Sequence, residues 1–131
     1  MERKVISPPT ISRSEVHGYS QGVVVEGGKK ILFIAGQLAV NRDGEFVGGS
    51  FREQCKMTYD GIEAVLKEAG ATRRDVTRIT AYLTDMKGDL EEFDRQNREF
   101  FSEGYPASTV VEVRALAFPG QVVEIDAVAV M

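Results

Sequence analysis

The sequence predicts a single α+β domain, in which one mixed sheet carries two helices on one face. Three observations carry this prediction. The chain has 131 residues, of which 43% are hydrophobic and 27% charged. Segments with the two-residue alternation of strands surround two segments with helical spacing, and turn signals separate them. The expected order of elements is ββ-α-β-α-ββ, with each helix following strands.

The first two strands are expected at residues 20–25 and 30–35, which are rich in β-branched and aromatic residues. Gly27 and Gly28 lie between them, and glycines supply the positive φ angles of a tight hairpin turn. The sequence therefore predicts an antiparallel hairpin here. A further turn is expected at Asp43 and Gly44.

The first helix is expected to begin after Ser50, because Ser50 and Glu53 have the spacing of a capping box. Gly70 is a natural residue to end it. The second helix is expected at about residues 90–102, with Gly104 after it. Apolar side chains recur at helical spacing in both segments, so each helix has one face for the core.

Three more strands are expected at residues 76–84, 108–114 and 121–130. In the last of them Val123, Ile125, Ala127 and Ala129 form one face, which predicts a buried side. The other face of the sheet mixes valines with polar residues, namely Val110, Val122, Val128 and Val130 among Ser108, Glu112, Glu124 and Asp126. A mixed face of this kind fits a subunit interface better than open solvent.

Composition limits the chemistry. The net charge is -4, which disfavours a nucleic-acid partner. With His17 as the one histidine and Cys55 as the one cysteine, a structural zinc site cannot be built within one chain, and neither a metal nor a cofactor is expected. We expect His17 to be structural or solvated and Cys55 to be inert core. No signal-peptide core or apolar run long enough to cross a bilayer is present, so a cytoplasmic protein without a membrane partner is expected.

Four segments resemble the RidA/YjgF family, some members of which are described as L-PSP endoribonucleases. They are GYSQG at 18–22, IAGQ at 34–37, PASTVVEV at 106–113 and VEIDAVAV at 123–130. The resemblance covers nearly the whole chain in the right order, so that residues 1–131 form a single RidA/YjgF-type domain. It implies a chorismate-mutase-like fold and a homotrimer with clefts between neighbouring protomers. It also implies hydrolysis of imines and enamines to a 2-oxo acid and ammonia.

The resemblance also assigns roles to single positions. Glu124 matches the glutamate that positions the attacking water and is the expected catalytic residue. The expected substrate-binding positions are Tyr19 and Gly36, which match the family, and Ala35, Ser108 and Val110, which stand where the deaminase branch has serine, arginine and cysteine. Asn97 is a candidate for a family asparagine on the second helix.

The serine at position 108 matters most, because an arginine binds a carboxylate bidentately and a serine offers one hydroxyl. Losing such a charged partner costs about 2–5 kcal/mol. The affinity for a 2-imino acid should then fall on the order of 30-fold to several thousandfold. The guanidinium of Arg114 or Arg78 from a neighbouring copy is the alternative cation.

Each assignment has a structural alternative. Glu124 and Asp126 could form interface ion pairs, although their spacing of about 6.6 Å on one strand face also suits a two-carboxylate acid/base site. Tyr19 could pack at a strand start, and Ser108 could be an edge hydroxyl. Three functions follow: a hydrolase of the imine/enamine deaminase type with altered substrate choice, a non-catalytic metabolite-binding trimer, and an endoribonuclease. The net charge and the single histidine oppose the third.

Overall fold

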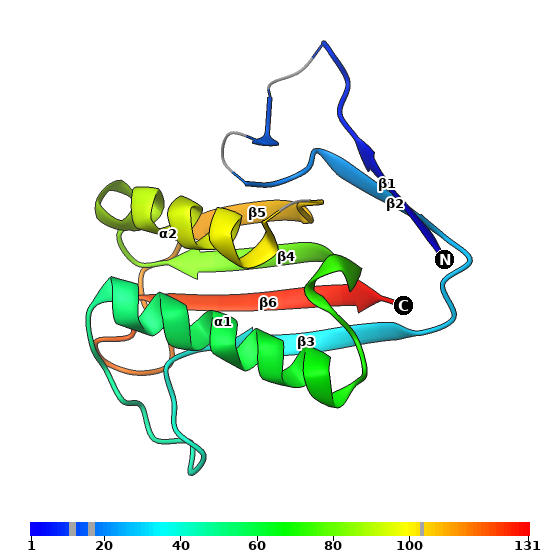
Figure 1. The fold of residues 1–131 in the computed structure, drawn as a ribbon. Coiled ribbons are helices and arrows are strands. Elements are labelled where there is room, and N and C mark those ends of the chain that lie inside the picture. The colour runs from blue at the N-terminus through cyan, green and yellow to red at the C-terminus, as the bar shows by residue number, and fades with distance from the viewer. Residues whose placement is uncertain (11–12, 16–17, 103) are drawn as a thin grey trace.

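The computed structural model describes residues 1–10, 13–15, 18–102 and 104–131. Its strands and helices are, in chain order, β1 (Glu2–Ile6), β2 (Gly22–Glu26), β3 (Ile31–Gln37), α1 (Phe51–Glu68), β4 (Val76–Leu83), α2 (Met86–Phe101), β5 (Ala107–Glu112) and β6 (Val123–Val130). The main sheet has the order β3-β6-β4-β5, and both helices cover the same face of it (Figure 1). β4 and β5 are parallel and the other neighbours antiparallel, which confirms an α+β fold with a mixed sheet.

Both helices begin at side-chain caps. The Ser50 hydroxyl accepts a hydrogen bond from the Glu53 N–H (3.2 Å), and the Glu53 carboxylate accepts one from the Ser50 N–H (3.1 Å), which confirms the capping box. Helix α2 begins earlier than predicted, because the Asp85 carboxylate accepts from the Gly88 N–H at 3.1 Å and caps a first turn without apolar spacing. Replacing such a cap by alanine typically costs about 1 kcal/mol.

The core lies between the helices and the covered face of the sheet. Val123, Ile125, Ala127 and Ala129 of β6 are at most 2% exposed, as the alternation predicts. The helices contribute large side chains to the same core, among them Tyr59, Ile62, Leu66 and Phe93. Each large apolar side chain buried in this way stabilises the fold by about 1.5–3 kcal/mol.

The predicted hairpin at residues 20–35 is wrong. β2 pairs with β1, which the sequence analysis did not predict, and the two form a separate two-stranded sheet, here called the ribbon. The segment between β2 and β3 is bound to the end of β6 instead of forming a free turn. The N–H groups of Lys29 and Lys30 both donate to the Met131 carbonyl (3.0 Å each), and the Met131 N–H donates to the Lys30 carbonyl (3.0 Å).

The side-chain direction along β5 also differs from the prediction. Ser108 pairs with Ile79 and Val110 with Ala81, and both of these β4 residues are fully buried under the helices. Partners in a ladder point to the same face of the sheet, so Ser108 and Val110 face the helices. The prediction that these mixed polar and apolar residues lie on the uncovered face is therefore correct for β6 and wrong for β5. Polar and apolar residues occur in both alternating sets of β5, so its own sequence gives no preference.

Candidate functional site

Glu124 lies against Gly36 on the uncovered face of the sheet. β3 and β6 pair with an irregularity between Ile34 and Gln37, and this places Gly36 beside Glu124. A β-carbon at position 36 would lie 2.8 Å from Cδ and 3.0 Å from Cγ of Glu124. Gly36 therefore leaves room for the Glu124 carboxylate where it lies, and a larger residue at this position would require the carboxylate to move.

A buried amide holds the same carboxylate from the other side. Gln121 is 4% exposed, and its Nε2 donates to Glu124 Oε1 at 3.1 Å and to the Val123 carbonyl at 3.2 Å. The amide side chain is neutral, so it orients the carboxylate without neutralising its charge. Sequence reasoning did not find Gln121, although its place just before the last strand brings it close to Glu124.

Tyr82 and Asp126 extend the site along the sheet. Tyr82 is the ladder partner of Glu124, and its hydroxyl donates to Asp126 Oδ2 at 3.2 Å. Desolvation raises the pKa of Tyr82, and the carboxylates of Asp126 and Glu124 raise it further. The hydroxyl therefore stays protonated at neutral pH and remains a donor. Glu124 and Asp126, here called the carboxylate pair, share the uncovered face as predicted.

Tyr19 lies at the far end of β5. Its neighbour Ser20 forms a bridge with Ala107, and the Ser20 hydroxyl donates to the Tyr105 carbonyl. Tyr19 lines a cavity of about 270 Å³ there. Ala107 pairs with Arg78, whereas Glu124 pairs with Tyr82 four residues further along β4. At about 3.3 Å per residue, the two sites are roughly 13 Å apart along the strand.

Within one chain, the predicted site residues lie in three separate places. Ala35 and Gly36 on β3 lie beside Glu124, and the Ala35 carbonyl accepts from Gln37 Nε2 at 3.0 Å. Ser108 and Val110 point to the opposite face of the sheet. Tyr19 lies at the far end, so a single chain does not assemble the predicted set.

Asn97 is 1% exposed and fully hydrogen-bonded. The Tyr59 hydroxyl donates to Asn97 Oδ1 at 2.8 Å, and Asn97 Nδ2 donates to the Gly18 carbonyl at 2.6 Å. Asn97 therefore ties helices α1 and α2 to the turn that precedes Tyr19. It is a positioning residue and does not line an open cleft in this chain.

The structure gives no catalytic or ligand-binding role to the remaining described residues that the sequence analysis discussed. Cys55 is fully buried in the core as predicted, and burial raises the pKa of its thiol to about 12. His17 lies outside the described residues. Among the residues that the structure describes, no group of three or more His, Cys, Asp or Glu side chains could hold a metal ion. Neither helix in the described ranges is long and apolar enough to cross a bilayer.

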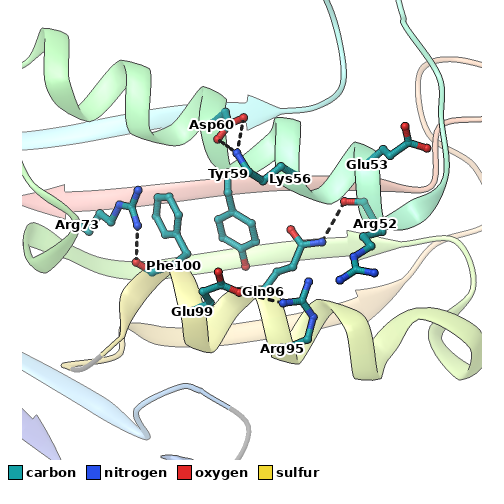
Figure 2. Close-up of a pocket in the computed structure, with 10 residues that line it drawn as sticks. All are labelled: Arg52, Glu53, Lys56, Tyr59, Asp60, Arg73, Arg95, Gln96, Glu99 and Phe100. Atoms are coloured by element: carbon teal, nitrogen blue, oxygen red, sulfur yellow. Dashed lines mark hydrogen bonds and ion pairs between the residues drawn. The ribbon is translucent and has the colours of Figure 1, made fainter.

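A larger cavity, of about 530 Å³, lies between α1 and α2 on the outside of the molecule (Figure 2). Tyr59 and Phe100 lie in it, with ring centroids 4.7 Å apart, and the Arg73 guanidinium stacks 4.0 Å above the Phe100 ring. Its charged groups form ion pairs, such as Lys56 with Asp60 at 2.7 Å and Arg95 with Glu99 at 2.9 Å. None of the residues that match the family's site positions lines this cavity, so Glu124 remains the candidate site.

Comparison with known proteins gives consistent matches. The family model described as endoribonuclease L-PSP matches residues 10–131. A RutC family protein of Pyrococcus abyssi is 38% identical over 113 residues, covering 85% of this chain and 84% of that protein. A 2-iminobutanoate/2-iminopropanoate deaminase of Bos taurus is 32% identical over 129 residues, covering 98% and 90%. The crystal structure of YyfB from Yersinia pestis, a Rid family protein of unknown function, matches with a TM-score of 0.91 at 35% identity, over all of both chains.

Proposed function

The chain belongs to the RidA/YjgF family, and on that premise we propose that it hydrolyses small imines or enamines in clefts formed between three copies. The proposal depends on the surroundings of Glu124, whose carboxylate lies between the Gly36 backbone and the Gln121 amide. Relatives at 30–32% identity are named 2-iminobutanoate/2-iminopropanoate deaminases, which supports this class of reaction.

In the proposed reaction, Glu124 accepts a proton from a water molecule as the water oxygen attacks the imine carbon. The C=N π electrons pass to nitrogen, which takes up a proton. Breaking the C–N bond then releases ammonia and leaves a carbonyl group, so that imine and water are converted into carbonyl compound and ammonia. The protonated Tyr82 hydroxyl, bound to Asp126, is a second proton-bearing group on the same face. A carboxylate placed to move a proton typically contributes about 10²–10⁴-fold in rate.

The substrate we propose lacks a carboxylate or presents it differently. The groups that hydrogen-bond the carboxylate pair, Gln121 and Tyr82, are neutral. Ser108 supplies a hydroxyl where the deaminase branch has a guanidinium, and a hydroxyl cannot neutralise a bound carboxylate. A neutral or cationic imine therefore fits this site better than a 2-imino acid.

A second copy is part of the proposal, because Tyr19 and Ser108 lie away from Glu124 within one chain. A cyclic trimer would place the Glu124 face of one copy against the Tyr19 end of the next. The exposed Val111 and the half-buried Val128 on the same face give such an interface a hydrophobic contact.

The test uses the purified protein with 2-iminopropanoate and with an uncharged imine, each generated in situ, and measures ammonia release. We expect faster turnover of the uncharged imine and loss of turnover in Glu124→Gln. The matched control is Glu68→Gln, the same chemical change at the exposed end of α1. Equal rates for wild type and Glu124→Gln on both imines would overturn the proposal.

Binding of a metabolite without turnover is the second candidate function. It is favoured by Ala35 and Val110, which replace the serine and cysteine of the deaminase branch with side chains that carry no polar group. It predicts saturable binding that Glu124→Gln weakens, with no ammonia released. Cleavage of RNA, which the family name suggests, is disfavoured by a net charge of -4 and a single histidine.

A further inference from the structure

Among the described residues, the outer edges of β2 and β3 have no partner strand, although their sequences suit each other. β3 is an outer strand of the main sheet, and β6 is its one partner among the described residues. β2 has β1 on one side and no described strand on the other. Open edges with free N–H and C=O groups are templates for pairing with another chain, and natural proteins usually cover or interrupt them.

Both edges are also apolar and exposed. Phe33 is 76% and Ile31 62% exposed on β3, and Val24 is 48% exposed on β2. An isolated two-stranded ribbon is marginally stable in water, so a ribbon with an open apolar edge gains much from a third strand. Exposed neighbouring apolar side chains of this kind mark an interaction surface.

The sequence itself encodes a pairing of β2 with β3. The four residues between Glu26 and Ile31 include two glycines, and a hairpin with this loop would place Val24 opposite Phe33. The chain does not make this pairing internally: β2 pairs with β1 alone among the described residues, and the backbone of Lys30 pairs with Met131 and so continues the β3–β6 ladder. Figure 1 shows the ribbon at the end of the sheet where β6 finishes, and not alongside β3.

Contacts with its own chain hold the ribbon in this place. The Arg3 guanidinium donates to the Val76 carbonyl at 3.2 Å, and Ser20, just before β2, forms its bridge with Ala107. These contacts leave the outer edge of β2 free. The ribbon is therefore held away from its own β3 by contacts within the chain.

We propose that the β1–β2 ribbon of one copy pairs through β2 with the open edge of β3 in a second copy, antiparallel and with Val24 opposite Phe33. The contact is head-to-tail, since β2 and β3 are different surfaces, and three such contacts close a ring. The inference shares with the proposed function only the association of copies, and it holds whether or not the trimer turns over a substrate.

The test is a disulfide that reports which chains are paired. Facing residues of neighbouring antiparallel strands have the Cα separation that a disulfide needs. Under mild oxidation, we expect Val24→Cys/Phe33→Cys in one chain to give covalent species of twice and three times the chain mass on a non-reducing gel. Cys55 is too deeply buried to compete. The register control is Val25→Cys/Phe33→Cys, because successive residues of β2 point to opposite sides and this pair should not link.

A disulfide within one chain would show that the hairpin closes internally and would overturn the inference. The absence of any disulfide in the folded protein would do the same. A mixture of the single variants Val24→Cys and Phe33→Cys repeats the test with half the substitutions in each chain, and linked pairs should form only in the mixture. Ammonia release by the unoxidised variants is scored separately, so loss of the strand pairing and loss of the proposed hydrolysis are told apart.

Discussion

The Glu124 carboxylate occupies the space that a β-carbon on residue 36 would need. Two strands that are far apart in the sequence therefore depend on each other at this point, because the glycine on β3 leaves the space that the carboxylate on β6 fills. This dependence predicts that a substitution at position 36 affects the site through the placement of Glu124.

Gly36→Ala should displace the Glu124 side chain from its seat. We expect a loss of at least tenfold in ammonia release and little change in stability, because the displaced atoms belong to the flexible, partly exposed end of the Glu124 side chain. Activity assays and urea unfolding measure the two effects. Gly22→Ala is the matched control, because its β-carbon would meet Ile6 at an ordinary 3.5 Å. Wild-type activity in Gly36→Ala would show that the seat is not needed.

Asn97→Ala should lower stability and also loosen the turn that carries Tyr19. It leaves the Tyr59 hydroxyl and the Gly18 carbonyl without their buried partner, which costs about 1–3 kcal/mol for each unsatisfied group. Tyr59→Phe is the matched variant, since it removes one hydrogen bond and keeps the one to Gly18. We expect both variants to be less stable and only Asn97→Ala to raise KM. A KM raised equally in both would contradict the positioning role.

Mixing inactive variants should restore activity if the site is shared between copies. Chains carrying Glu124→Gln still have Tyr19, and chains carrying Tyr19→Ala still have Glu124. When the two are refolded together, a site is intact wherever a Tyr19→Ala chain supplies Glu124 and its neighbour, a Glu124→Gln chain, supplies Tyr19. In a randomly mixed cyclic trimer this holds for roughly a quarter of the sites. Each variant refolded alone is the control. A mixture as inactive as its components would place both residues of the site in the same chain.

The acid stability of the protein should depend on Glu92. Hydrogen bonds from Arg95 lower the pKa of Glu92 to about 2, with a further one from Gln96. A lowered pKa stabilises the fold above the unfolded value, near 4.3, and this contribution is lost as the pH falls toward 2. Glu92→Gln should therefore be less stable than wild type at pH 7 and equally stable near pH 2. Urea midpoints across this range measure the difference, with the exposed Glu91→Gln as control, and a constant difference would refute the linkage.

The fold was predictable where local signals and burial agree. Ser50 and Glu53 mark the start of α1, and the alternation from Val123 to Ala129 marks the buried face of β6. The hairpin prediction is wrong because the local glycine turn favours a pairing of β2 with β3, whereas β2 pairs with β1 near the start of the chain. Composition within β2 carries no trace of that partner.

The sequence predicted the site residue on β6, but not the residues that surround it. Glu124 stands out by motif, and the uncovered face of β6 follows from its alternation. The direction of Ser108 depends on its pairing with Ile79, and the neighbourhood of Gln121 depends on the loop before β6. Both are decided by tertiary packing, which a single sequence does not specify.

The register of β5 gives this fold a simple way to change its chemistry. Adding or removing one residue between Gly104 and Ala107 would slide the strand by one position against β4 and reverse every side chain on it. Ser108 and Val110 would then come out on the uncovered face, one strand away from Glu124, while Thr109 turned in toward the helices. A change of length in this short connection would thus exchange the β5 side chains that share the uncovered face with Glu124, with no change to any strand residue.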